Sequence, residues 1–467
     1  MQKKKTPPVI PTVPEDTIAA ISTPPGEGAI GIVRLSGPNA IRIGAAIFHS
    51  SSGRDITTDP GRVFHGEIRA GEETLDEVLV HVMRGPHSYT CEDVLEINAH
   101  GGAGPLKAIL ELVLEKGARL AEPGEFTKRA FLNGRIDLVQ AEAVIDRIRA
   151  KTRAGLRAAH TAASGTLSKA IAAMREPLLE ALARIEASVD FPEEDLPELV
   201  TPELKASLTE IAGQMEALFE TSDAGRLYRE GASVTIAGRP NVGKSSLFNA
   251  LLRDARAIVT AHPGTTRDLL EEFITIQGIP IRLSDTAGLR QSQDEIERIG
   301  VDIARGALTA ADIVLFVVEA TNPATPEDEA LATDLSALEV PVLLVVNKTD
   351  LAANPDTSHW KDRFAGTCLL SARTGAGLQE LEAALAGQLL RGTSLSPSEV
   401  LITRVHQRDS LRRAHQALEH LLEDFQASPE FLSIDLRDAL NALGEITGET
   451  VTEDILDRIF SSFCIGK

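Results

Sequence analysis

The stretch Val234-Thr235-Ile236-Ala237-Gly238-Arg239-Pro240-Asn241-Val242-Gly243-Lys244-Ser245 decides the fold of the middle of the chain. Its first four residues form a short apolar run typical of a buried strand, and the other eight fit Gly-x-x-x-x-Gly-Lys-Ser/Thr at every fixed position. A helix is predicted over residues 246–252. There the glycines let backbone N–H groups close around phosphate oxygens, and the helix N-terminus adds its dipole. The stretch predicts a phosphate-binding loop, with Lys244 at the phosphates and Ser245 on Mg²⁺.

Three further motifs lie at the ends of predicted strands. Asp285-Thr286-Ala287-Gly288 ends one strand, where Asp285 would reach the metal through water and the Gly288 N–H would sense the terminal phosphate. Asn347-Lys348-Thr349-Asp350 follows another strand, and Asp350 can accept hydrogen bonds from N1–H and N2–H₂ of guanine, a donor pair that adenine lacks. Ser371-Ala372-Arg373 would support the base with a main-chain N–H. These motifs predict GTP as the nucleotide, and their order resembles the Ras-like GTPase superfamily.

By this resemblance, Gly264-Thr265-Thr266-Arg267-Asp268 is the first switch, with Thr266 on Mg²⁺. Ras-like enzymes have a glutamine after Asp-x-x-Gly that orients the attacking water, whereas this chain has Leu289, which cannot form a hydrogen bond. A carboxylate among Asp294, Glu295 and Glu297 could position the water instead. The same residues could equally be the solvated, acidic start of a helix. A bound monovalent cation would supply the positive charge that an arginine otherwise brings.

The composition limits the other classes of function. The chain has 467 residues and a net charge of −21, which argues against a protein that coats nucleic acid through its overall charge. Aromatic residues make up only 4%, so a platform for stacking bases is not expected. Cys91, Cys368 and Cys464 are widely separated, which excludes a Cys-x-x-Cys zinc site, and we expect Cys91 and Cys368 to be packing residues. No apolar run is long enough for a membrane span, and a cytoplasmic protein is predicted.

The pattern along the chain predicts three domains. Residues 1–137 are expected to form an α+β domain, residues 138–230 plus 392–467 a split all-α helical domain, and residues 231–391 an α/β G domain inserted into it. The clearest expected elements of the first domain are strands over 29–35, 78–82 and 94–97 and helices over 40–47 and 106–114. In the helical domain we expect Pro177 to interrupt a helix and helical stretches to run over 405–426 and 434–463.

Further motifs point to one family. They are the phosphate loop joined to Pro-Gly-Thr-Thr-Arg-Asp at residues 263–268, the Asp-Glu-Ile-Glu-Arg-Ile-Gly run at 294–300, Pro-Gly-Glu-Phe-Thr at 123–127 and Phe-Cys-Ile-Gly-Lys at 463–467. Together they resemble the MnmE (TrmE) family of tRNA-modification GTPases over nearly the whole chain. The resemblance implies a folate-binding N-terminal domain and a potassium-dependent GTPase. It also implies a homodimer whose G domains meet when GTP and K⁺ are bound.

The resemblance assigns residues to these sites. Glu297 matches the family's water-orienting glutamate, and Asn241, Thr260, His262 and Thr265 would frame K⁺, while Ser245 and Thr266 hold Mg²⁺. The residues expected to bind GTP are Asn241, Val242, Gly243, Lys244, Ser245, Ser246, Thr260, Ala261, His262, Pro263, Gly264, Thr265, Thr266, Asp285, Thr286, Ala287, Gly288, Asn347, Lys348, Asp350, Ser371, Ala372 and Arg373.

A second site is implied in the N-terminal domain, for a 5-formyl- or methylene-tetrahydrofolate. Arg34, Glu96 and Arg135 match the folate-binding positions, and Lys467 would reach the same site. Taken without the family, Arg34 and Glu96 would be strand-end surface residues. Cys464 is either a reactive thiol or a small apolar side chain near the folate.

The implied reaction is shared with a flavoprotein partner, MnmG (GidA), which carries FAD. The pair would attach an aminomethyl or carboxymethylaminomethyl group at C5 of the wobble uridine of certain tRNAs, using the folate carbon. Two basic segments could contact tRNA or the partner: Arg149, Arg153 and Arg157 at helical spacing, and Arg404, Arg408, Arg412 and Arg413. The alternative is that both are solvated helix faces.

Two other functions remain open from the sequence. One is a ribosome-assembly or RNA-binding GTPase switch, because such proteins share the motifs of the G domain. The N-terminal module and the Cys-Ile-Gly-Lys terminus argue against it. The other is a structural dimer with a vestigial GTPase, which the intact guanine, phosphate and metal motifs disfavour.

Overall fold

The computed structural model describes residues 15–58, 61–190, 201–254, 271–285, 306, 308–352, 354–390 and 399–467. The chain divides into two compact units. The first contains Met1–Ile145, Ala163–Gly213 and Asp409–Lys467, and the second contains Asp146–Ala162 and Gln214–Arg408. No helix in the described part of the chain is both long enough and apolar enough to cross a membrane.

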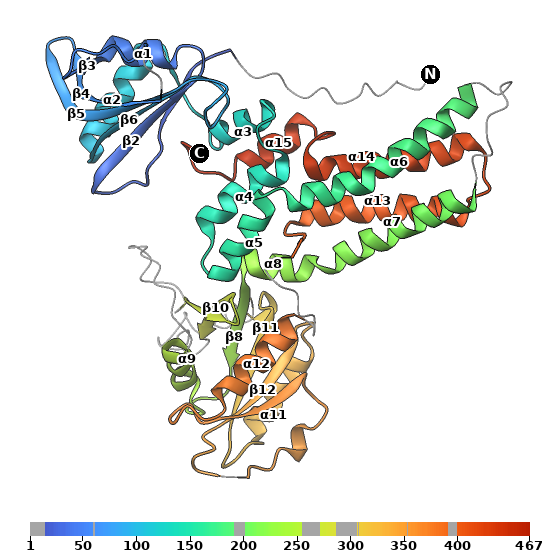
Figure 1. Cartoon of the computed structure of the whole chain (residues 1–467). Helices are drawn as coiled ribbons and strands as arrows, with labels where there is room; N and C mark the ends of the chain where they lie inside the picture. Colours follow the sequence, from blue (N-terminus) through green and yellow to red (C-terminus); the bar gives the residue numbers. More distant parts are fainter. Residues whose placement is uncertain are drawn as a thin grey trace. The chain divides into compact units, whose positions relative to one another are not determined.

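Seven strands of the first unit form one sheet in the order β3-β4-β5-β6-β2-β1-β7 (Figure 1). The strands are β1 (Ile18–Ile21), β2 (Gly28–Ser36), β3 (Phe48–Ser50), β4 (Val63–Ala70), β5 (Glu73–Met83), β6 (Val94–Gly101) and β7 (Arg119–Leu120). Neighbouring strands are antiparallel except β1 and β7, which are parallel. The predicted α+β domain is confirmed, and the three expected strands correspond to β2, β5 and β6.

The core of this sheet lies on the face covered by α1 (Ala40–Ile47) and α2 (Ala103–Glu115). Val33 and Leu35 of β2 and Ile97 of β6 are fully buried there. Because side chains alternate along a strand, Arg34 and Glu96 point to the opposite face. The two residues are also paired in the register of β2 with β6, so their side chains are neighbours.

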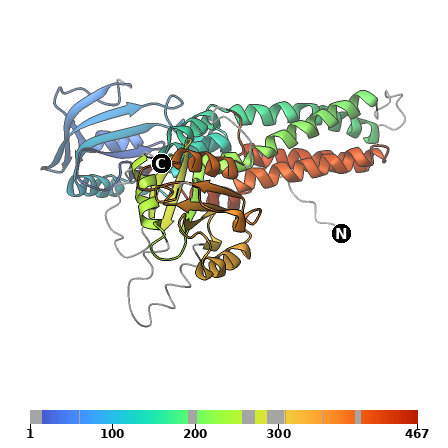
Figure 2. The ribbon, with the colours of Figure 1, turned by 90° about the horizontal axis from the view of Figure 1, so that it is seen from below.

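Helices make up the rest of the first unit, and α4, α7 and α13 continue into the second. They are α3 (Glu125–Leu132), α4 (Leu138–Arg149), α6 (Thr166–Asp190), α7 (Pro202–Glu220), α13 (Val405–Glu423), α14 (Pro429–Thr447) and α15 (Glu453–Phe460). The two views show α6 and α14 side by side (Figure 1, Figure 2).

Two expectations for these helices were wrong. Pro177 lies inside α6 instead of interrupting it. A proline inside a helix removes one hydrogen bond and costs about 3 kcal/mol, but Met174 and Leu178 beside it are buried, and this packing favours a continuous helix. The single helical stretch expected over 434–463 is instead α14 and α15, because Gly448 adopts φ 92° and ends α14.

The second unit contains a six-stranded sheet in the order β13-β12-β11-β8-β10-β9. Its strands are β8 (Ala232–Ala237), β9 (Glu271–Ile276), β10 (Ile279–Asp285), β11 (Ile313–Glu319), β12 (Val342–Asn347) and β13 (Gly366–Leu369). Only β9 and β10 pair antiparallel, so the predicted, largely parallel sheet is confirmed. Buried clusters lie on both faces, packed by α9 (Lys244–Asp254) and α12 (Leu378–Leu389) on one side and α11 (Pro326–Ser336) on the other.

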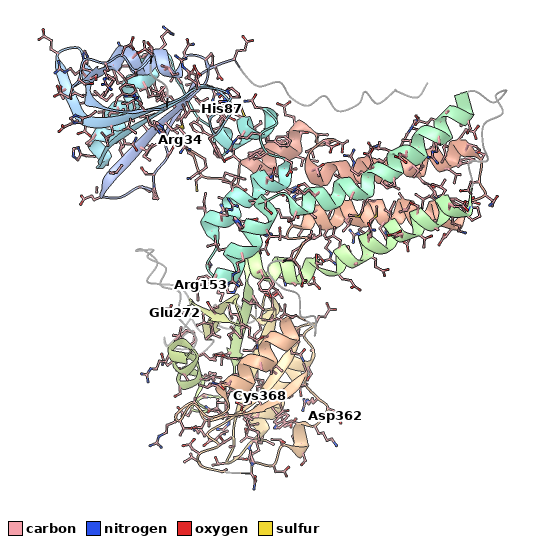
Figure 3. All side chains as sticks on the ribbon, in the orientation of Figure 1. Arg34, His87, Arg153, Glu272, Asp362 and Cys368 are labelled. Atoms are coloured by element: carbon pink, nitrogen blue, oxygen red, sulfur yellow. The ribbon has the colours of Figure 1, made fainter. Side chains whose placement is uncertain are left out.

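The second unit also contains α5 (Arg153–Ala163) and α8 (Ser222–Glu230). The expectation that Arg149, Arg153 and Arg157 share one helix face was wrong, because α4 ends at Arg149 and α5 begins at Arg153 (Figure 3). Thr152 explains the break, since its hydroxyl accepts a hydrogen bond of 3.0 Å from the Gly155 N–H and so starts a new helix.

Candidate functional site

The phosphate loop joins β8 to α9 at the carboxyl edge of the parallel sheet. Gly238 and Gly243 have φ of 155° and 97°, and Asn241 has φ 66°, a left-handed conformation that asparagine tolerates. A Cβ on Gly243 would lie 2.3 Å from Nδ2 of Asn347. The phosphate loop and residues 347–350, which we call the guanine motif, therefore approach each other too closely for a side chain at position 243. The Lys244 ammonium donates to the Arg239 carbonyl at 2.9 Å.

The guanine motif is held to the phosphate loop by Asn347. Its side chain is almost fully buried, and its Nδ2 donates to the Val242 carbonyl at 2.9 Å. Its Oδ1 accepts hydrogen bonds from the N–H groups of Lys348 and Ala372, at 2.8 and 3.0 Å. Asn347 therefore binds three segments that are far apart in the sequence: the phosphate loop, its own motif and the Ser371-Ala372-Arg373 motif.

Asp350 is oriented by the third of these segments. The Ser371 hydroxyl donates to Oδ1 of Asp350 at 2.7 Å. The Arg373 guanidinium lies 4.0 Å from the other carboxylate oxygen, Oδ2, and is exposed. Asp350 thus has a fixed carboxylate with oxygen lone pairs free for a ligand, as recognition of guanine requires.

These residues surround a hollow of about 820 Å³, a volume in the range of small-molecule sites. Its walls come from the phosphate loop and α9, from the guanine motif and from the loop after β13. The lining residues are Gly243, Ser246, Asn249, Ala250, Arg253, Asn347, Lys348, Asp350, Leu351, Ala372, Arg373, Thr374, Gly375 and Leu378. The structure thus brings together seven residues that the sequence assigned to GTP: Gly243, Ser246, Asn347, Lys348, Asp350, Ala372 and Arg373.

The metal side of this site is described in part. Asp285 ends β10, which runs parallel to β8 with Asp285 opposite Ile236, so the phosphate loop and Asp285 leave the sheet at the same edge. Ser245 follows Lys244 at the start of α9. The remaining predicted residues lie outside the described part of the chain: Thr260, Ala261, His262, Pro263, Gly264, Thr265, Thr266, Thr286, Ala287, Gly288 and Glu297.

A second group of polar residues lies on the open face of the N-terminal sheet. Arg34 Nε and Glu96 Oε1 form an ion pair of 2.8 Å, with both side chains less than one-fifth exposed. Arg34 also donates to the Gly466 carbonyl at 3.4 Å. The C-terminal residues therefore reach this group, and Lys467 follows directly.

Two aromatic rings, which the sequence analysis missed, connect this group to Arg135. The Arg34 guanidinium lies 5.7 Å from the Phe126 ring centroid, and that of Arg135 lies 5.1 Å from the Tyr89 ring centroid. Tyr89 packs against the small cluster that contains Phe126. Burial raises the pKa of Tyr89 above its ordinary value, although the hydrogen bond between Tyr89 and Thr127 and the charges of Arg135 and Arg34 oppose the rise. The structure thus places Arg34 and Arg135 over two apolar rings of one cluster, with Glu96 paired to Arg34.

Two family models match the chain. A model described as the GTP-binding protein TrmE N-terminus matches residues 17–135, and one described as the MnmE helical domain matches residues 138–464. The tRNA modification GTPase MnmE of Desulforamulus reducens is 44% identical over 464 residues, which cover 97% of this chain and 100% of that protein. The chain belongs to the MnmE family. Another MnmE, from Geobacillus thermodenitrificans, is 47% identical over 464 residues, with 97% of this chain and 99% of the relative covered. The crystal structure of the T. maritima FeoB G domain is 32% identical, covers 34% of this chain and 98% of that one, and gives a TM-score of 0.27.

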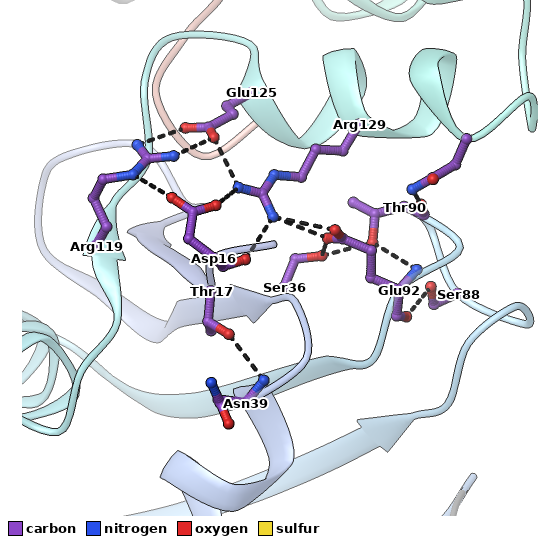
Figure 4. A network of polar contacts seen from close by, with 11 residues as sticks. Asp16, Thr17, Ser36, Asn39, Ser88, Thr90, Glu92, Arg119, Glu125 and Arg129 are labelled. Carbon is purple, nitrogen blue, oxygen red and sulfur yellow. Dashed lines mark hydrogen bonds and ion pairs between the residues drawn. The ribbon is translucent and has the colours of Figure 1, made fainter. Parts of the chain in front are cut away.

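In this MnmE-family chain an ionic network connects α3 to Asp16, Glu92 and Arg119 (Figure 4). Arg129 of α3 is 1% exposed, and its guanidinium contacts the carboxylates of Asp16, Glu92 and Glu125. Burial raises the pKa of Glu125, but hydrogen bonds from Arg119, the Glu122 N–H and Arg129 outweigh it, so the pKa lies below its ordinary value. The network fixes α3, and hence Phe126, against the sheet.

The cysteines of the chain differ in their surroundings. Cys368 is buried in a core of the six-stranded sheet, in residues 231–391, which we call the G region. This burial was expected, and it raises the pKa of the Cys368 thiol. Cys91 is half-buried with φ 62° and is not among the fully buried residues of a core. Cys464 is exposed, and its carbonyl accepts a hydrogen bond from the Gly124 N–H at 3.3 Å.

The second basic segment is neutralised in large part by neighbouring carboxylates. Arg404 pairs with Asp146 at 2.8 Å, and Arg412 pairs with Asp409 at 2.8 Å. Arg408 and Arg413 lie against Asp223 and Glu445. This segment therefore offers less positive charge to a polyanion than its sequence indicates.

Proposed function

We propose that this MnmE-family chain is a potassium-dependent GTPase that modifies C5 of the wobble uridine of certain tRNAs together with a flavoprotein partner, MnmG (GidA). The observation that carries the proposal is the hollow between the phosphate loop, Asn347 and Asp350. A fixed carboxylate there faces the region where a base would lie, with the phosphate loop at the other end. The family name, tRNA modification GTPase MnmE, supports the role in tRNA modification.

The residues of the G region fit the proposed ions. Mg²⁺ prefers oxygen ligands, which the hydroxyls of Ser245 and Thr266 supply, and it would balance phosphate charge when bound. Asn241 offers an amide oxygen and an exposed left-handed backbone for K⁺, together with Thr260, His262 and Thr265 from beyond the described residues. Lys244 holds the phosphates, and we propose that Glu297 orients the attacking water, since Leu289 cannot.

The second site fits a one-carbon tetrahydrofolate. The Glu96 carboxylate can accept from the N–H edge of a pterin, and Arg34, Arg135 and Lys467 can meet carboxylates of the glutamate tail. Tyr89 and Phe126 provide apolar surface beneath. The folate would supply the carbon and FAD on the partner the redox chemistry, and a homodimer is the proposed assembly. This site favours the modifying enzyme over an RNA-binding switch, which has no use for a folate.

The deciding experiment is GTP turnover in K⁺ against Na⁺ at equal ionic strength. Wild type is expected to be faster in K⁺ by at least about tenfold, because the cation stabilises charge that develops on the phosphates. Glu297→Ala is expected to lose most of the activity with little change in GTP affinity, whereas the matched control Glu295→Ala keeps it. Equal rates in both salts, with no effect of Glu297→Ala, would contradict the proposed mechanism.

A further inference from the structure

A single carboxylate, that of Glu319, contacts both the phosphate loop and the guanine motif. Glu319 is the last residue of β11, between β8 and β12 in the sheet. Its Oε1 lies 3.2 Å from Nζ of Lys348, and its Oε2 lies 3.4 Å from Nη2 of Arg239. Lys348 belongs to the guanine motif and Arg239 to the phosphate loop, so one side chain bridges the two loops.

The Arg239 end of this bridge and its central carboxylate are fixed by other contacts. Arg239 Nε pairs with Oδ2 of Asp328 at 3.2 Å, and Asp328 is fully buried at the start of α11. Thr325 and Asp328 form a reciprocal capping box that fixes that carboxylate. On the other side, the Thr321 hydroxyl donates to Oε1 of Glu319 at 3.0 Å. The bridge is therefore anchored at a helix terminus and is not a loose surface pair.

The charge state supports the same arrangement. Burial raises the pKa of Glu319, but the Thr321 and Lys348 hydrogen bonds and the charges of Lys348 and Arg239 outweigh it and hold the pKa below its ordinary value. Glu319 is thus ionised at neutral pH. All three side chains of the bridge are less than one-third exposed, so solvent screens the pairs only in part.

The bridge connects the two loops that would hold the two ends of the nucleotide, its phosphates and its base. The Arg239 carbonyl also accepts a hydrogen bond from the Lys244 ammonium, at 2.9 Å. The position of Arg239 therefore affects the lysine that is proposed to hold the phosphates. Lys348 has φ 66°, a conformation that a lysine adopts only when its surroundings impose it. The ion pair with Glu319 is one such constraint.

We propose that Glu319 is a positioning residue for nucleotide binding, which keeps the phosphate loop and the guanine motif at the separation that one GTP molecule spans. The inference rests on the proposed GTPase function and adds to it a coupling between the base subsite and the phosphate subsite. A ligand that occupies both subsites depends on this separation. A ligand that occupies only one does not.

The test compares the affinities of Glu319→Gln and wild type for three ligands. Binding of a fluorescent GDP is measured directly, and guanosine and pyrophosphate are measured by their competition with it. Loss of one charge-assisted bridge is expected to raise the GDP dissociation constant about 5- to 20-fold, mainly through faster dissociation. Affinities for guanosine and pyrophosphate are expected to change less than about twofold, and kcat at saturating GTP likewise. Glu329→Gln is the matched control, because Glu329 pairs with Arg363 at 2.9 Å in the same unit but with neither loop.

A second variant removes the other half of the bridge. Arg239→Gln is expected to weaken GDP binding to a similar degree, and the double variant Glu319→Gln/Arg239→Gln is expected to be little worse than either single variant, because both remove the same coupling. Unchanged GDP dissociation in Glu319→Gln overturns the inference. So does a loss for guanosine as large as that for GDP, which indicates general loosening of the fold. Wild type that fails to bind GDP would instead contradict the proposed function itself.

Discussion

Arg34 and Glu96 face each other across β2 and β6 and form an ion pair of 2.8 Å on the sheet face opposite the core. A pair of this kind contributes little to folding, about 0–1 kcal/mol when partly exposed. Beside it, Arg34 and Arg135 lie over Phe126 and Tyr89, two rings that also pack in a small buried cluster. The proposed folate, which has both N–H donors and carboxylates, would use the charged groups of Arg34, Glu96 and Arg135 together.

Glu96→Gln should therefore weaken folate binding and leave stability nearly unchanged. The amide keeps the shape but replaces one acceptor oxygen by a donor, which then faces donors of the pterin. We expect the dissociation constant for 5-formyltetrahydrofolate to rise at least about tenfold, since a hydrogen bond to a charged group contributes about 1.5–3 kcal/mol. Titration calorimetry on the full chain measures it. Glu77→Gln is the control, because Glu77 pairs with His65 on the same sheet at 2.7 Å and lies away from the group.

Asp350→Asn should change which base is bound. The carboxylate accepts two hydrogen bonds from guanine, whereas an amide offers one acceptor and one donor and so matches xanthine. GDP affinity should fall by a factor of hundreds, from about 3–4 kcal/mol of lost interaction, and affinity for xanthosine diphosphate should rise. Ser371→Ala, which removes only the 2.7 Å hydrogen bond that orients Asp350, should cost several-fold without the switch of base. A variant that loses both nucleotides equally would show damage to the fold instead.

Much of the G region could be predicted from the sequence, because its chemistry depends on short, contiguous motifs. Gly243, Asn347 and Asp350 each sit in a run of residues with fixed spacing, and the strands before them are short and mostly apolar. The bridging role of Glu319 was not predicted, since it arises from three side chains at positions 239, 319 and 348 that only the fold brings together. One signal was available: a charged residue at the carboxyl end of a buried parallel strand lies where ligands bind in such sheets.

The N-terminal site shows the same limit. Arg34 and Glu96 were found only through the family resemblance. Phe126 stands in the Pro-Gly-Glu-Phe-Thr motif but was not assigned to this group, and Tyr89 carries no motif that marks it. Errors among the helices have a different origin. Local rules predicted a break at Pro177 and a continuous face through Arg149 and Arg153, but packing of α6 overrides the first and Thr152 capping a new helix overrides the second. Tertiary packing, which a single sequence does not show, decided the first. The second depends on a local threonine cap, a signal that the sequence does contain and that the analysis of spacing overlooked.

Arg153 and Arg157 are basic residues that are accessible to a nucleic acid. Both are exposed on α5, whereas the 404–413 segment is paired with carboxylates. We expect Arg153→Glu/Arg157→Glu to weaken tRNA binding and to reduce the slope of log affinity against log salt by about one unit for each phosphate that is no longer neutralised. Arg412→Glu serves as control, because Asp409 already balances its charge. If the slope of log affinity against log salt is unchanged in the double variant, the arginines of α5 face solvent and do not contact tRNA.

Arg129 should stabilise the N-terminal fold at neutral pH through ion pairs that are lost in acid. Its buried guanidinium meets the carboxylates of Asp16, Glu92 and Glu125, and Arg129→Met would remove this shared cation, at a cost of about 3–5 kcal/mol. Burial raises the pKa of Asp16, as it does that of Glu125, but hydrogen bonds from Arg119 and Arg129 outweigh it and hold the pKa of Asp16 below its ordinary value. Carboxylates of this kind stabilise the fold above their ordinary pKa, and that stability is lost as pH falls through the lowered values.

Acid unfolding of the N-terminal unit should therefore begin below about pH 4 in wild type. In Arg129→Met it should begin at higher pH, because the pKa values of the carboxylates rise when the cation is removed. The single tryptophan, Trp360, is buried in the G region and reports on that region alone. Circular dichroism of the full chain should show the shifted transition while Trp360 fluorescence keeps the midpoint of wild type. If the two probes shift together, the network stabilises the whole chain and its effect is not confined to the unit that contains Arg129.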